Sequence, residues 1–360
     1  MKRPPVFLLM VLWLAATLPG PASASYDEVG SGQTKLRLDT ALLAQLKRDG
    51  VKILTRAPAH FRGGVVTFPA GGGKFDPTAG KATIDHEGAL ILKAKKGALS
   101  LKRLQLKSTR RSAPLAARLG GGQLKLGTTS HLAASRRGFG ETFQISTLRL
   151  SAKVAARLNK RLQLRSPVRA GQPLAAATST VQPLAVSVLD RGRASLELAP
   201  PFAAKLDQLH VAVTPIFPGE HPGAFTFAIS GGRIAPDLKQ GTLLLQGGME
   251  FLQLGGGQAI WSAASIDLDS SLLVPEVDLE PAPPYAGKLG PSPVAGLELL
   301  PGQAEADPRL RRIAMKQTPL LLSATTAARF NEIFAKPQGR DGVFAAGEPL
   351  GLLSFSAQGQ

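Results

Sequence analysis

The stretch SAKVAARLN at residues 151–159 returns as SATTAARFN at residues 323–331, so the chain contains a long internal repeat. Three further segments recur in the same order on either side of this pair. They are LRLDTALLAQL (36–46) with LELAPPFAAKL (196–206), GGKF (72–75) with GGRI (231–234), and AGQPL (170–174) with AGEPL (346–350). A period this long indicates two tandem domains, because solenoid repeats are only about 20–50 residues long.

The repeat also predicts the domain boundaries. We expect a first domain over residues 35–178, a linker over 179–194 and a second domain over 195–355. Each domain falls in the usual range of roughly 100–200 residues and is long enough to bury a core. Hydrophobic residues make up 44% of the chain and charged residues 19%, which is typical of a globular protein rather than a disordered one.

Short apolar segments separated by turn residues predict the fold class. The alternation of leucine with polar residues over 99–106 indicates half-buried strands, and the three glycines at 71–73 indicate a turn. Apolar residues at helical spacing follow three suitable N-cap positions, which are Asp39 or Thr40, Ser151 and Ser323. We therefore expect mainly β domains of sandwich or barrel type, each with two short helices.

The first 24 residues have the pattern of a secretory signal peptide. Lys2 and Arg3 precede an apolar run over 6–18, and an A-x-A cleavage site lies at 22–24. The run is too short to span a bilayer, which needs about 20 residues. We expect a secreted, extracellular protein, with attachment to the cell wall left open. The chain has no cysteine, which excludes disulfides and thiolate chemistry.

Charge is distributed very unevenly. Residues 35–178 hold 28 Lys and Arg against 6 Asp and Glu, whereas residues 195–355 hold 11 against 16. Such a basic domain is expected to attract an anionic envelope polymer or a membrane surface. Specific nucleic-acid binding is not expected, because residues 88–170 contain only two aromatic residues for base stacking. The predicted anion-binding patch comprises Lys93, Lys95, Lys96, Lys102, Arg103, Lys107, Arg110 and Arg111.

No catalytic signature is present, so no enzymatic activity is expected. GGGK at 71–74 lacks the spacing of a phosphate-binding loop, and Phe75 stands where Ser or Thr is required. No metal site is expected either, because the five histidines never fall at metal-ligand spacing. They are His60, His86, His131, His210 and His221.

The segment FDPTAGKATIDHEGAL at 75–90, followed by KGALSL at 96–101, resembles the HtaA-type domain family. The resemblance extends through the repeat to both domains. It implies exported, β-rich cell-envelope modules, some of which bind haem and transfer it. The family's haem binders use a Tyr in the first strand and a His in a later turn. Here the strand over 60–68 contains no Tyr, and Lys95 occupies the turn position.

Two functions follow from these observations. The first is an exported, non-enzymatic binding or structural protein of the cell envelope, whose basic first domain contacts anionic surface polymers or lipid. The alternative is a haem-binding or haem-transfer protein, for which His86 and His60 are the candidate ligands. The oligomeric state is left open.

Overall fold

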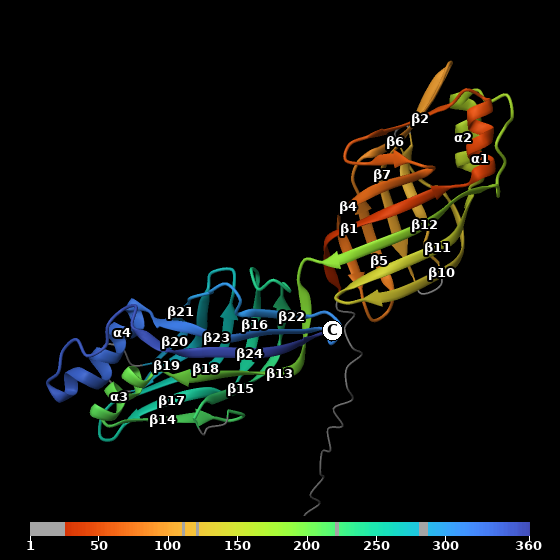
Figure 1. Cartoon of the computed structure of the whole chain (residues 1–360). Helices are drawn as coiled ribbons and strands as arrows, with labels where there is room; N and C mark the ends of the chain where they lie inside the picture. Colours follow the sequence, from red (N-terminus) through yellow and green to blue (C-terminus); the bar gives the residue numbers. More distant parts are fainter. Residues whose placement is uncertain (1–25, 110–111, 120–121, 220–222, 281–286) are drawn as a thin grey trace, which may run out of the picture.

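The computed structural model describes residues 26–360 except 110–111, 120–121, 220–222 and 281–286 (Figure 1). The predicted signal peptide, Arg110, Arg111 and Tyr285 lie outside the described residues. Among those described, no helix combines the length and the hydropathy needed to cross a membrane.

In the described part of the first unit there are twelve strands and two helices. The helices are α1 (Thr40–Arg48) and α2 (Ala152–Leu162). The strands are β1 (Asp27–Leu38), β2 (Lys52–Arg56), β3 (His60–Arg62), β4 (Val65–Asp76), β5 (Lys81–His86), β6 (Ala89–Ala94), β7 (Gly97–Ser108), β8 (Leu115–Leu119), β9 (Gly122–Lys125), β10 (Gly127–Arg137), β11 (Gly140–Leu150) and β12 (Pro173–Pro183).

The second unit repeats this order. Its helices are α3 (Pro200–Gln208) and α4 (Ala324–Phe330), and α4 continues into a π-helical segment (Asn331–Ala335) and a 3₁₀ turn (Lys336–Gln338). The strands are β13 (Val186–Leu198), β14 (Val211–Ile216), β15 (Phe225–Ile234), β16 (Gly241–Gln246), β17 (Gly248–Gln253), β18 (Gln258–Asp267), β19 (Leu272–Glu280), β20 (Gly287–Pro291), β21 (Ala295–Leu297), β22 (Ala304–Asp307), β23 (Arg312–Leu322) and β24 (Pro349–Gly359).

Both units have the same antiparallel strand order. In the second unit, β16, β15, β13, β24, β23, β21, β19 and β18 follow one another, and the pairing of β18 with β19 closes the ring into a barrel. The first unit has the order β5, β4, β1, β12, β11, β10 on one side and β7, β8 on the other. The Leu126 N–H donates to the Leu115 carbonyl at 2.8 Å, as the Val294 N–H does to the Leu273 carbonyl at 3.0 Å in the second unit. The expectation of two mainly β units with short helices is confirmed.

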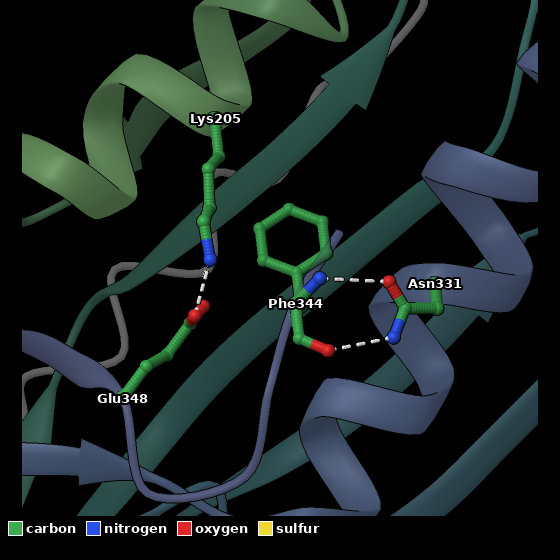
Figure 2. Close-up of polar contacts among 4 residues, drawn as sticks. All are labelled: Lys205, Asn331, Phe344 and Glu348. Atoms are coloured by element: carbon green, nitrogen blue, oxygen red, sulfur yellow. Dashed lines mark hydrogen bonds and ion pairs between the residues drawn. The ribbon is translucent and has the colours of Figure 1, made fainter. Parts of the chain in front are cut away.

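The helix N-termini form as their sequences predict. The side chains of Asp39, Ser151 and Ser323 accept hydrogen bonds from the backbone N–H three residues later. Such caps satisfy donors that a helix leaves without partners and contribute about 1 kcal/mol each. An asparagine in α2, and another at the start of the π-helical segment after α4, form hydrogen bonds with the backbone of the following loop. Asn159 does so with Val168, and Asn331 does so with Phe344 (Figure 2).

Two expectations about local structure are wrong. The glycines at 71–73 lie inside β4 as a bulge rather than in a turn, since the register with β5 shifts between Ala70 and Gly72. Gly73 has φ +121°, and a Cβ there would lie 2.1 Å from the Thr83 carbonyl oxygen. Residues 179–194, expected as a linker, belong to the end of β12 and the start of β13. Their backbone groups pair with neighbouring strands, so little free connector remains.

Each unit has its own apolar core, and both polar and apolar contacts join the two. Asp27, fully buried at the start of β1, accepts bonds from the Ser187 N–H at 3.0 Å and the Ser187 hydroxyl at 2.9 Å. Phe139, from the turn between β10 and β11, packs into the core of the second unit. The junction therefore lies at the end of the first barrel away from α1 and α2 and at the end of the second barrel away from α3 and α4 (Figure 1).

Candidate anion-binding site

The helices of the first unit lie together at one end of its barrel, beside β6 and β7 (Figure 1). The Gln45 amide on α1 donates to the Ser166 carbonyl at 2.6 Å, and Asp49 accepts from the Ser166 N–H at 3.3 Å. The turn between β6 and β7 packs directly against the end of α2. At Gly97 a Cβ would lie 2.1 Å from the Arg161 carbonyl oxygen, so there is no room for a side chain. Four chain segments therefore converge here: 47–52, 93–97, 160–161 and 163–166.

These segments carry most of the positive charge at this end, and we call them the helix-end cations. Their side chains are exposed, and within the described residues none of them forms an ion pair. Asp49 is the one acidic residue in the four segments. The helix-end cations are Lys47, Arg48, Lys52, Lys93, Lys95, Lys96, Lys160, Arg161 and Arg165. Like charges held this close create a positive potential that favours an anionic partner.

The residues of the predicted anion-binding patch do not lie together in the structure. Lys93, Lys95 and Lys96 belong to the helix-end cations. Lys102 and Arg103 lie further along β7, at a bulge, and Lys107 lies near the other end of that strand. A β-strand rises about 3.3 Å per residue, so the patch extends along the hairpin rather than gathering in one place.

Arg103 contributes to a separate polar groove on the outside of the barrel. The groove has a volume of about 240 Å³, and Arg118 from β8 lines its other side. Between them, the Gln105 amide donates to Asp85 at 2.8 Å and the Gln123 amide donates to Gln105 at 3.2 Å. The two guanidinium groups are exposed and can supply bidentate donors to a small anion.

The second unit lacks the cation cluster at the equivalent positions. Eight of the nine cations align with residues of the repeat, and none of their counterparts is basic. The counterparts are Asp207, Gln208, Ala212, Leu252, Leu254, Gly255, Glu332 and Ile333. The sequence did not show that 47–52 and 160–166 join the predicted patch, because that proximity depends on how the helices pack.

A matched pair of contacts shows the same divergence. In the second unit Lys205 forms an ion pair with Glu348 (Figure 2). The aligned residues of the first unit are Gln45 and Gln172, whose amides share a hydrogen bond of 3.0 Å. The fold therefore keeps the contact in both units, but the cation at this position is neutralised in one and absent in the other.

His86, a predicted haem ligand, lies inside the first barrel and is only 6% exposed. Its Nδ1 lies 3.0 Å from the Leu104 carbonyl, which can only accept, so Nδ1 carries a proton. Nε2 lies 2.5 Å from the Thr34 hydroxyl, and that oxygen is 2.8 Å from Ser179 Oγ. Burial lowers the pKa of His86 from its ordinary value of 6.5, so the ring is neutral. Both ring nitrogens are thus engaged within the protein.

The residues present do not fit haem at His86, because a metal bond to either nitrogen requires one of these hydrogen bonds to be broken. His60 is exposed on β3, where its strand neighbour is Thr67. Lys95, at the turn position, is exposed as well. Haem ligation therefore stays a prediction. The register also pairs Ile84 with Gly73 and Leu243 with Gly232, so His86 corresponds to Leu245 of the second unit.

Glu141 is a second buried ionisable group of the first barrel, at 3% exposure. Burial raises the pKa of its carboxyl to about 7, the positive charge of Arg136 opposes this, and Asp76 adds to it. Its Oε2 has no hydrogen-bond partner. The repeat places Ile313 at the same position of the second barrel. Among the described residues, no group of three or more His, Asp or Glu side chains could hold a metal ion.

Comparison with known proteins identifies only structural neighbours. No protein-family model matches the chain, and neither does any curated protein. The C-terminal domain of HtaA from Corynebacterium glutamicum matches 43% of this chain and 98% of its own length, with 12% identity and a TM-score of 0.37. The N-terminal domain of the same protein matches 48% of this chain and 99% of its own length, with 17% identity and a TM-score of 0.37. Both are domains of the family that the sequence resembles.

Proposed function

We propose that this chain is an exported, non-enzymatic binding protein of a cell envelope, whose first unit contacts an anionic polymer or lipid surface. The observation that supports this most directly is the set of nine helix-end cations with one acidic neighbour. The signal-peptide pattern of residues 1–24 supports export. Because the same end of the second unit is neutral to acidic, that unit is expected to face a different partner or none.

The proposed contact is electrostatic. The side chains are exposed lysines and arginines, which release counterions from a polyanion when they replace them. Charges in water are screened beyond about 10 Å at 0.1 M salt, so such binding weakens steeply as salt rises. No cavity or induced change is required for this contact.

Co-sedimentation tests the proposal. The chain without residues 1–24 is mixed with vesicles of phosphatidylglycerol, vesicles of phosphatidylcholine, or insoluble polyphosphate, at about 50 mM and about 500 mM salt. We expect binding to both anionic materials at low salt, little at high salt, and none to phosphatidylcholine. Binding of equal strength at both salt concentrations would contradict the proposal.

A matched pair of variants locates the surface. Lys93→Gln with Lys95→Gln removes two helix-end cations, whereas Lys35→Gln with Lys81→Gln removes the same charge from exposed positions on β1 and β5. We expect the first double variant to weaken binding at least about tenfold and the second to have a smaller effect, because the helix-end cations contact the anion directly. Equal losses would show that only the net charge matters.

A further inference from the structure

An apolar cavity lies behind the helix-end cations. It has a volume of about 40 Å³ and lies between α1, α2 and the sheet formed by β6, β7 and β8. Eleven leucines and Val154 line it, so no polar side chain faces it. Because a single water needs roughly 10–15 Å³ by this measure and also needs polar partners, the cavity suits a few carbon atoms better than water.

The second unit fills the same space with aromatic rings. The repeat and the strand register align Leu42 with Phe202, Leu92 with Phe251, Leu101 with Trp261, and Leu158 with Phe330. In the second unit these rings pack closely, with centroids 4.8 Å apart for Phe251 and Trp261 and 5.0 Å apart for Phe251 and Phe330.

Phe344 completes that aromatic cluster. Its ring centroid lies 5.4 Å from that of Phe330, and Asn331 holds its backbone through two hydrogen bonds (Figure 2). The aligned residue of the first unit is Val168, held in the same way by Asn159. Aromatic side chains therefore fill this space in the second unit, whereas the first unit keeps a cavity there. The cavity is in the unit that carries the helix-end cations.

Residues that line the cavity are followed directly or closely in the chain by helix-end cations. Leu46 and Leu92 line the cavity, and the next residues, Lys47 and Lys93, are exposed helix-end cations. Leu158 lines it on α2, two residues before the exposed Lys160. An occupant with an apolar end inside and a negative group outside would satisfy both features. Its apolar part must be narrow, since the cavity admits a few carbon atoms and no ring system.

We propose that the first unit binds the end of one saturated acyl chain in this cavity, with the anionic group of the same amphiphile on the helix-end cations. This inference rests on the proposed function, because it specifies which anionic partner the first unit takes. Each methylene group transferred from water contributes about fourfold in affinity, so chain length is the natural variable. Aliphatic lining without polar atoms offers no preference beyond length and shape.

Calorimetric titration of the chain lacking residues 1–24 tests the proposal with butyrate, octanoate and laurate. We expect affinity to rise about fourfold per methylene until the cavity is full, with no measurable binding of butyrate. Dodecyltrimethylammonium, which has the same chain length as laurate and the opposite charge, should bind at least about tenfold more weakly. Equal binding of the two charged amphiphiles, or no binding of laurate, would overturn the proposal.

Cavity-filling variants provide the residue-level test. Leu158→Phe and Leu101→Trp introduce the residues of the second unit, whereas Leu54→Phe adds the same ring as the first at an exposed position of β2. We expect either filled variant to lower laurate affinity at least about tenfold, and Leu54→Phe to leave it unchanged. Unchanged laurate affinity in a filled variant that retains its circular dichroism spectrum would refute the site.

Two further measurements separate the outcomes. Polyphosphate binding should persist in the filled variants; its absence from the unaltered chain would refute the proposed function rather than the cavity alone. If the filled variants fail to fold, a fatty acid with a nitroxide near its methyl end is added to the unaltered chain. It should broaden the methyl resonances of Leu101 and Leu158 but not those of Leu196 and Leu353 in the second unit, and broadening of neither pair would also refute the site.

Discussion

Glu141 gives the first barrel a pH-dependent stability that a single substitution should remove. Its carboxyl is 3% exposed, its Oε2 lacks a hydrogen-bond partner, and its pKa is raised from 4.5 to about 7 by burial. Because folding raises this pKa, the folded chain holds the proton more tightly than the unfolded chain. The contribution of Glu141 to the free energy of unfolding is therefore largest below pH 4.5 and is lost as pH rises through about 7.

The magnitude follows from the difference between the two pKa values, which corresponds to roughly 3 kcal/mol when the group is fully ionised. Partial access of water and the nearby charge of Arg136 reduce this, and a glutamine must itself be buried. We therefore expect Glu141→Gln to raise the free energy of unfolding by about 1–2 kcal/mol at about pH 8 and to change it little at about pH 5.

Urea unfolding of the chain lacking residues 1–24, at both pH values, measures the effect. Glu298→Gln provides the control, because that carboxyl is exposed and should give no pH-dependent difference. A Glu141→Gln variant that is equally destabilised at both pH values would refute the reasoning, since it would show that the carboxylate is held by contacts that favour its charged form.

Four other predictions concern neighbouring features. Asn159→Ala should lower the free energy of unfolding by about 2 kcal/mol because it removes two hydrogen bonds to Val168, and an unchanged urea midpoint would contradict this. Burial lowers the pKa of His86, so the chain should lose stability as pH falls below 6.5; His86→Leu should lose less over that range, although it is less stable at neutral pH. His86→Leu should leave any haem-induced Soret band unchanged, because both ring nitrogens are already engaged, and loss of the band from a folded variant would restore His86 as a ligand. Filling the cavity with Leu158→Phe should raise the free energy of unfolding by up to about 1 kcal/mol if the ring fits. A loss of several kcal/mol in urea unfolding would show that the cavity has no room for the ring.

Features that depend on neighbouring residues in the chain could be predicted. The N-caps at Asp39, Ser151 and Ser323 form through contacts three residues apart. The strand over 97–108 follows its alternating pattern. The repeat itself predicted a second copy of each element, and the two barrels share one strand order.

The errors arose where a distant strand decides the conformation. The residues around Gly73 predict a turn, but the segment is part of β4. The Thr83 carbonyl of β5 lies where a side chain at Gly73 would be, so this position requires glycine. Residues 179–194 read as a linker, but β1 and β24 supply hydrogen-bond partners for parts of them. The contacts of His86 with the Leu104 carbonyl and the Thr34 hydroxyl likewise cross the barrel and have no signal in its own segment, while its role as a haem ligand stays a prediction.

The repeat, the β-rich class, the helix caps and the contrast in charge between the units are all legible in the amino-acid sequence, because each depends on composition or on contacts within a few residues. Folding brings nine cations from four segments to one end of the first barrel, and it leaves a leucine-lined cavity behind them where the second unit has aromatic rings. Both features depend on residues more than a hundred positions apart. Their proximity is set by the closing of strands into a barrel and the packing of helices on it, which no local pattern specifies.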